Sequence, residues 1–168
     1  MKHIAWFFTL TFATVTVGLA AQPPGLDAIA LYNGTWRSTI TRHATMYSKP
    51  STQTSVAHND CWRSGDFYAC HQTVDGKSMA LIVYTFNAAT NTYRTSIVTP
   101  NGTSAGGGTL IIAGNRWTYP WIQKDGNKTV YFRVVNIFTD PNTIVFRSEF
   151  SYDQHTWTRT GDGIEHRQ

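Results

Sequence analysis

The chain has 168 residues, of which 14% are charged and 41% are hydrophobic, and its formal net charge is +4. The basic residues are scattered and form no run. Nucleic-acid binding needs a basic stripe or patch, so we expect no nucleic-acid partner.

The N-terminal residues are typical of a secretory signal peptide. A short basic start precedes an apolar run from Ile4 to Ala21, and small residues stand just before Pro23. We expect a signal peptide over 1–21 and a single secreted or periplasmic domain over 22–168. An uncleaved membrane anchor is the alternative, but the run is barely long enough to span a bilayer and carries several threonines. After cleavage we expect no stable membrane insertion.

The rest of the chain predicts an all-β domain with one short helix, over Gly25 to Leu31. Turn signals recur every 8–12 residues, which is typical of an antiparallel sandwich or barrel. Sequential hairpins favour an up-and-down barrel of about eight to ten strands, because closure removes exposed strand edges. Upstream of Gly114, strands are expected over about 35–44, 52–62, 67–74, 77–86, 92–99 and 105–113.

The stretch from Gly114 to Trp157 predicts a meander with one strongly aromatic face. From Arg116 to Ile122, aromatic residues fall on every second position, and alternate residues of a strand share a face. Asp125-Gly126 is a strong hairpin signal, because a type I′ turn needs φ > 0 at both central positions. Asp75-Gly76 is a second signal of the same kind.

The turns set the expected register of this meander. Asp125-Gly126 pairs Trp121 with Val130, a loop at Asp140-Pro141-Asn142 pairs Phe132 with Phe150, and a turn at Asp153-Gln154 sets Trp157 opposite Phe150. One face then collects Trp117, Tyr119, Trp121, Val130, Phe132, Val134, Phe146, Phe150 and Trp157. A one-residue slip would scramble this face, so its consistency supports the pairing.

The opposite face of the meander places Arg133 directly across from Glu149. A surface ion pair worth under about 1 kcal/mol is the expected role, in preference to a catalytic pair. Gly106-Gly107-Gly108 does not resemble a phosphate loop, since no helix follows, and strand glycines mark bulges or bends.

Cys61 and Cys70 flank a turn at Gly65-Asp66, which places them opposite each other in a non-hydrogen-bonded pair. Side chains approach most closely at such pairs, so we expect a disulfide, consistent with export. A metal pair is the alternative, but the spacing of the nearby histidines His58 and His71 is not typical of zinc sites.

A helical lead-in followed by Gly34-Thr35-Trp36 resembles the Gly-x-Trp opening of lipocalin-like (calycin) barrels. The chain also resembles uncharacterised secreted bacterial families with that opening, whose last hairpin carries Asp-Gly-x-x-Trp. Here the corresponding stretch is 153–157, with Gln154 where those families have Gly. The resemblance extends from Leu26 to Arg159 and implies a barrel with an apolar ligand and no established activity.

We therefore expect an exported, non-catalytic barrel that binds a small apolar or amphipathic molecule in its interior, without cofactor or metal. The interior is either a cavity or a core packed by its own side chains. We count Arg159 among the expected ligand contacts because an arginine among aromatic residues can hold a carboxylate. The alternative is an arginine at the barrel rim whose guanidinium lies in water. The expected ligand contacts are Trp36, Trp117, Tyr119, Trp121, Phe132, Phe146, Phe150, Trp157 and Arg159.

Two other functions are considered. A carbohydrate-binding β-sandwich would use Trp117, Tyr119 and Trp121 as an exposed stacking platform, but these residues pair with Val130, Phe132 and Val134, which belong inside. A barrel enzyme of isomerase or cyclase type would need an acid–base set, and none is readable.

Overall fold

A computed structural model describes residues 25–168, so the expected signal peptide lies outside the described residues. A 3₁₀ helix, η1 (Gly25–Tyr32), precedes ten strands. Their bounds are β1 (Gly34–Arg42), β2 (Ser51–Ser64), β3 (Phe67–Val74), β4 (Lys77–Asn87), β5 (Thr92–Val98), β6 (Ser104–Ala113), β7 (Arg116–Asp125), β8 (Lys128–Asp140), β9 (Thr143–Ser151) and β10 (Thr158–Arg167). Among residues 25–168, no helix is long and apolar enough to cross a membrane.

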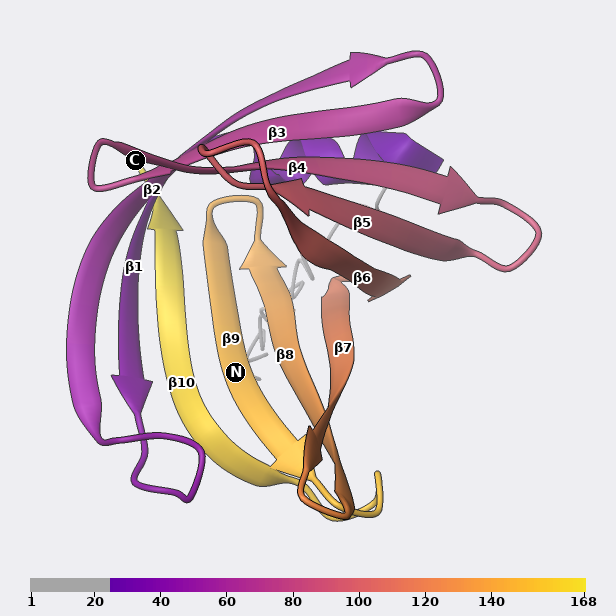
Figure 1. Ribbon diagram of the computed structural model, residues 1–168. Helices are drawn as coiled ribbons and strands as arrows, with labels where there is room; N and C mark the ends of the chain where they lie inside the picture. Colours follow the sequence, from indigo (N-terminus) through magenta and orange to yellow (C-terminus); the bar gives the residue numbers. More distant parts are fainter. Residues whose placement is uncertain (1–24) are drawn as a thin grey trace, which may run out of the picture.

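The strands form a closed antiparallel barrel in the order β1-β10-β9-β8-β7-β6-β5-β4-β3-β2. Each strand pairs with its neighbours in sequence, and β1 pairs with β10 to close the ring (Figure 1). This confirms the all-β up-and-down barrel with a short N-terminal helix. The closed ring also excludes the β-sandwich fold of the carbohydrate-binding alternative.

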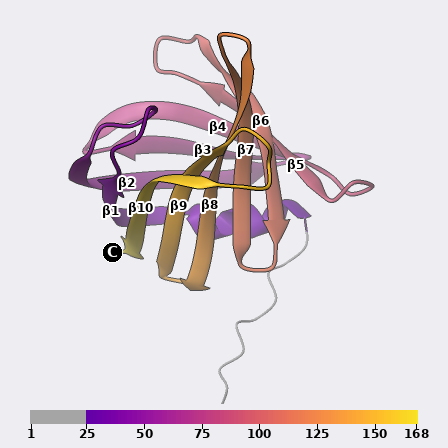
Figure 2. The ribbon, with the colours of Figure 1, turned by 90° about the horizontal axis from the view of Figure 1, so that it is seen from below.

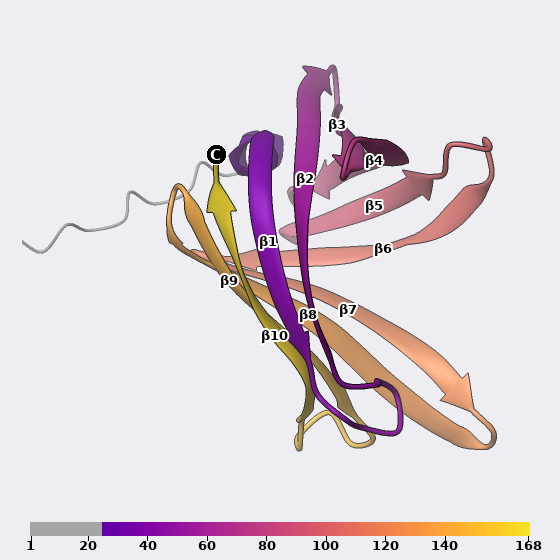
Figure 3. The ribbon, with the colours of Figure 1, turned by 90° about the vertical axis from the view of Figure 1, so that its left-hand side faces the viewer.

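The barrel is strongly bent, so that β3–β6 form one part and β1 with β7–β10 form the other (Figure 3). The long strand β2 runs through both parts. The first part of β2 pairs with β1, and the last part pairs with β3. Figure 3 shows β4, β5 and β6 diverging from β7–β10. The seam between β6 and β7 is short, with three paired positions from Ile111↔Thr118 to Ala113↔Arg116. Pro120 lies just beyond it and has no N–H to continue a ladder.

Turn chemistry predicted the faces of most strands, but not every register. Asp75 and Gly76 both have positive φ, as a type I′ turn requires. The β7–β8 turn instead consists of Gly126 and Asn127, because Asp125 pairs with Lys128. Only Gly126 needs φ > 0 there, which is the type II′ solution. Trp121 therefore pairs with Phe132 and not with Val130, a two-residue shift that preserves the aromatic face.

Bulges account for two further differences. Between β3 and β4 the register shifts between Gln72 and Thr73, so His71 pairs with Leu81, one residue beyond the Ala80 that an unbroken ladder gives. Between β8 and β9 the turn is one residue shorter than expected, because Asp140 pairs with Thr143, and a shift between Phe138 and Asp140 restores the expected pairing of Phe132 with Phe150. The glycines 106–108 lie at the bulge between β5 and β6, where Gly106 has a φ of 91°.

The β9–β10 connection is a six-residue loop, not a two-residue turn. The Asp153 carboxylate accepts hydrogen bonds from the backbone N–H groups of His155 and Thr156, which organises the loop. These bonds lower the pKa of Asp153 well below its ordinary value. Thr158, not Trp157, pairs with Phe150, so Trp157 lies on the outer face of the barrel.

We predict that Gly76→Ala destabilises the protein by about 1–2 kcal/mol, since Gly76 has a φ of 76° and a Cβ strains that conformation. Gly108→Ala is the matched control. Its backbone is not left-handed, and a Cβ there would lie 3.7 Å from Thr95 Oγ1, an ordinary contact. Urea unfolding with the disulfide intact measures both. Equal effects of the two substitutions would show that the turn is not of the left-handed type.

Candidate functional site

One end of the barrel is closed by η1, whose side chains Leu26, Ala28 and Ile29 are buried. The helix contacts β2, β3 and β4 and crosses the barrel end (Figure 2). Trp36 and Trp117 complete this packed layer and are almost fully buried. Tyr32 lies at the end of the helix, so its side chain enters the barrel from this layer.

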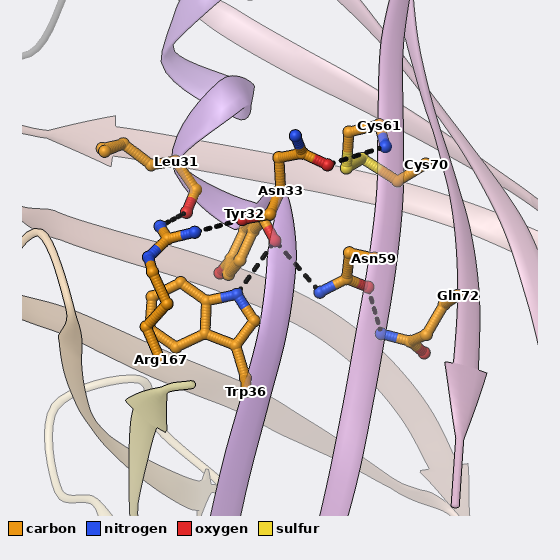
Figure 4. The surroundings of a disulfide bond; sticks show 9 residues. All are labelled: Leu31, Tyr32, Asn33, Trp36, Asn59, Cys61, Cys70, Gln72 and Arg167. Atoms are coloured by element: carbon orange, nitrogen blue, oxygen red, sulfur yellow. Dashed lines mark hydrogen bonds between the residues drawn. A yellow bond between two sulfur atoms is a disulfide. The ribbon is translucent and has the colours of Figure 1, made fainter. Parts of the chain in front are cut away.

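The last turn of the helix is held by side chains from three strands (Figure 4). The backbone carbonyl of Tyr32 accepts hydrogen bonds from Trp36 Nε1 at 3.0 Å and from Asn59 Nδ2 at 3.2 Å. Arg167 lies over the Trp36 ring at 4.3 Å and donates to the carbonyls of Leu31 and Asn33. The last two carbonyls of the helix, those of Leu31 and Tyr32, are thereby satisfied.

Cys61 and Cys70 form a disulfide, and their Cα atoms are 4.0 Å apart across β2 and β3. This confirms the pairing expected from the Gly65-Asp66 turn. The Cys61 N–H donates to Asn33 Oδ1, which ties the disulfide to the start of β1 (Figure 4). Cys70 faces the barrel interior.

Beneath the closed end lies a cavity of about 520 Å³, which we call the helix-end cavity. Its size is within the range of small-molecule sites, roughly 300–1,000 Å³. The lining comes from η1 and from β2, β3, β4, β5, β7, β8 and β10, and no β6 side chain contributes. The lining residues are Tyr32, Ala57, Asn59, Cys70, Gln72, Ile82, Tyr84, Thr95, Ile97, Tyr119, Val134, Asn136 and Glu165.

Three tyrosine hydroxyls meet in this cavity. Tyr119 donates to the Tyr32 hydroxyl at 3.1 Å, and Asn136 Nδ2 donates to the same oxygen at 2.6 Å. The Tyr84 side chain also interacts with that of Tyr119. Burial raises the pKa of Tyr84 to about 12 and raises the pKa of Tyr32 and of Tyr119 as well. All three phenols are therefore neutral at physiological pH.

Glu165 is the one carboxylate among the residues that line the helix-end cavity. Burial raises its pKa, and a hydrogen bond with the Ser38 side chain acts in the opposite direction. No ion pair joins Glu165 to a basic side chain within residues 25–168. Its neighbour along the strand, Arg167, is engaged with Trp36 and with the carbonyls at the helix end.

A second cavity of about 600 Å³, the loop-end cavity, lies at the opposite end of β1. Tyr47, from the loop between β1 and β2, packs edge-on against Phe132 and Phe150. Its hydroxyl donates to Asp125 Oδ2 at 2.7 Å, which anchors the loop to the tip of the β7–β8 hairpin. The lining residues are Ile40, Arg42, Tyr47, Ser48, Lys49, Ser51, Trp121, Phe132, Ser148, Glu149 and Thr160.

The expected ligand contacts do not form one group in the structure. Tyr119 lines the helix-end cavity, while Trp121 and Phe132 line the loop-end cavity. Trp36, Trp117 and Phe146 belong to the packed layer at the closed end, and Phe150 packs with Val130 under Tyr47. Phe146 lies against Gly163, where a Cβ would be 2.1 Å from the Phe146 ring.

Trp157 and Arg159 are on the outer face, contrary to the expected register. The longer β9–β10 loop moves Trp157 over the Arg133 guanidinium, at 3.6 Å. Arg159 pairs across the strands with Glu149 and donates to Asp162 Oδ1 at 2.7 Å. Arg133 and Glu149 form the expected ion pair at 2.7 Å, but Glu149 is buried and not at the surface.

Sequence reasoning missed most of the polar lining: Tyr32, Asn59, Gln72, Tyr84, Asn136 and Glu165. For Asn136 a signal was present, since it lies two residues beyond Val134 and so shares the interior face. Glu165 has no comparable signal. Its face depends on the register of β10, which includes a shift between Arg159 and Gly161.

No protein-family model matches the chain, and no curated protein matches it. One similar solved structure is Rv2717c from M. tuberculosis, at 14% identity and a TM-score of 0.47, covering 90% of this chain and 99% of that one. Another is the S-type phycobiliprotein lyase CPES from Guillardia theta, at 9% identity and a TM-score of 0.45, covering 83% and 90% of the two chains.

We predict that Glu165→Gln stabilises the ligand-free protein at pH 8. A carboxyl whose pKa is raised on folding binds its proton more tightly in the folded state. Stability therefore falls as the pH rises from the pKa of the unfolded chain through the raised pKa of the folded protein. The loss amounts to about 1.4 kcal/mol for each unit by which the pKa is raised. Thermal unfolding should show a higher Tm for the variant at pH 8 and no difference at about pH 4.

The matched control is Asp60→Asn, which removes the same charge from an exposed position on the outer face of β2. It should leave Tm unchanged at both pH values. A Glu165→Gln variant that is less stable than the parent at pH 8 would show that the carboxylate is paired in solution.

Proposed function

We propose that this barrel binds one small amphipathic molecule in the helix-end cavity. The observation that carries the proposal is a cavity of about 520 Å³ whose wall combines apolar side chains with hydroxyl, amide and carboxylate groups. Small-molecule sites have this character, with a mostly apolar wall and a few polar groups that fix orientation.

The chemistry of the wall supports an amphipathic ligand over a purely apolar one. Ile82, Ile97 and Val134 offer aliphatic surface. Tyr32, Asn136 and Glu165 offer hydrogen-bonding groups that a hydrocarbon cannot satisfy. Burying polar groups against a hydrocarbon costs free energy unless they keep hydrogen-bond partners. A molecule with one polar end and one apolar part satisfies both regions.

The glycine-rich stretch of β6 helps to leave this space. Gly108 pairs with Thr95, a cavity residue, and shares its face, yet it has no side chain to enter the interior. The short seam between β6 and β7 ends at Thr118, so Tyr119 has no partner on β6 in the ladder. An interior filled by its own side chains, the alternative raised by the sequence, would need larger residues at this point.

A sugar-stacking platform is not supported by the positions of the aromatic residues. Trp117 is fully buried beneath the helix, and Tyr119 faces the interior. Trp121 is 40% exposed, but alone it offers a single ring and no extended platform.

We predict that Val134→Trp abolishes the binding of a neutral apolar dye, Nile red, because Val134 lines the helix-end cavity and an indole fills part of it. The parent should bind about one dye per chain, measured by fluorescence titration. Thermal stability should fall little, because a cavity accepts added volume, whereas overpacking a filled core costs about 1–3 kcal/mol.

Ile40→Trp is the matched control, since Ile40 lines the loop-end cavity instead. It should leave dye binding at the helix end intact. If the parent binds no dye and Val134→Trp strongly destabilises the fold, the interior is a packed core and the proposal is wrong. Loss of binding in Ile40→Trp alone would place the ligand at the loop end.

We propose further that the chain acts outside the cytoplasm, as its first residues indicate. The Cys61–Cys70 disulfide supports this, since disulfides persist in oxidising compartments. Expression with the natural N-terminus, followed by cell fractionation and intact mass, should give an exported protein that lacks residues 1–21 and has no free thiol. A cytoplasmic, full-length and reduced product would contradict export.

A further inference from the structure

We propose that the polar end of the bound molecule is an organic ammonium group, which Glu165 receives inside the helix-end cavity. This inference rests on the proposed function, because it names the class of ligand for the same cavity. It starts from an imbalance of charge. The cavity wall contains one acidic side chain and no basic one.

The charged neighbours of Glu165 do not neutralise it. Across β1 it pairs with the uncharged Ser38, and across β9 it pairs with the apolar Ile144. Arg167 follows on the same strand, but its guanidinium covers Trp36 and donates to carbonyls of the helix end. A carboxylate without a cation in a partly buried site is unfavourable for the fold, which indicates a role in binding.

The aromatic residues that line the same cavity as Glu165 favour the same class of ligand. Three phenol rings, those of Tyr32, Tyr84 and Tyr119, line the cavity and stay neutral. The faces of aromatic rings attract ammonium groups, and aromatic cages are a recurrent way to hold them. A carboxylate ligand would instead meet the negative charge of Glu165 and find no basic side chain in this cavity.

A metal ion is a poorer match than an organic cation. Within residues 25–168, no three His, Cys, Asp or Glu side chains lie close enough together to hold one. Ile82, Ile97 and Val134 also require an apolar surface on the ligand. An ammonium group carried on a hydrocarbon or an aromatic ring satisfies the charge and the apolar wall together.

The test is a competition at pH 8 between Nile red and three amphiphiles with the same chain: octylammonium, octanol and octanoate. The parent should bind octylammonium at least about ten-fold more tightly than octanol, a difference of about 1.4 kcal/mol, and octanoate most weakly. Glu165→Gln should remove the preference for octylammonium while it retains octanol and the dye. Asp60→Asn, with the same change of charge on the outer face, should keep the parent's preference.

The outcomes separate this inference from the proposed function. If the dye and octanol bind but octylammonium has no advantage, or if Glu165→Gln keeps that advantage, the ammonium assignment is wrong and the binding function stands. If octanoate binds best, the assignment is wrong and the basic side chains Arg42 and Lys49 of the loop-end cavity become the anchor to test. If nothing binds, including the dye, both proposals fail.

Discussion

The arrangement of this protein depends on how the end of its only described helix is secured. Two side chains from adjacent strands, Trp36 and Asn59, donate to the Tyr32 carbonyl, while Arg167 from the last strand covers Trp36 and satisfies neighbouring carbonyls. These contacts join the first, second and last strands to the helix. They close one end of the barrel at the point where the ring itself closes, between β1 and β10.

Closing the end in this way also creates the site. Because its backbone carbonyl is fixed by two hydrogen bonds, Tyr32 presents its hydroxyl to the interior, where Tyr119 and Asn136 donate to it. The strand β10 supplies Arg167 to the contacts at the helix end and Glu165 to the cavity. The side chain that holds the helix end and the carboxylate that lines the cavity thus lie two residues apart on one strand. A change in the contacts of Arg167 is therefore expected to disturb the cavity as well.

The two ends of the barrel differ in charge. The helix-end cavity contains a single carboxylate among neutral phenols and amides, whereas the loop-end cavity has Arg42 and Lys49 as well as Glu149 at its wall. The aromatic residues that dominate the sequence are largely used for packing, at the closed end and beneath Tyr47. Abundance of aromatic residues on one face therefore identified the interior, but not the part of it that is open.

The sequence by itself determined the fold class, the hairpin order, the Cys61–Cys70 pair and the inward face of β7 and β8. All of these depend on local turn chemistry and on the two-residue period of a strand, which neighbouring residues set. Only the tertiary structure decided the rest. A six-residue loop placed Trp157 and Arg159 outside, and a shift in β10 precedes the inward placement of Glu165. Loop length and bulges depend on contacts between distant segments, so residues near them in sequence do not specify which face the following side chains take.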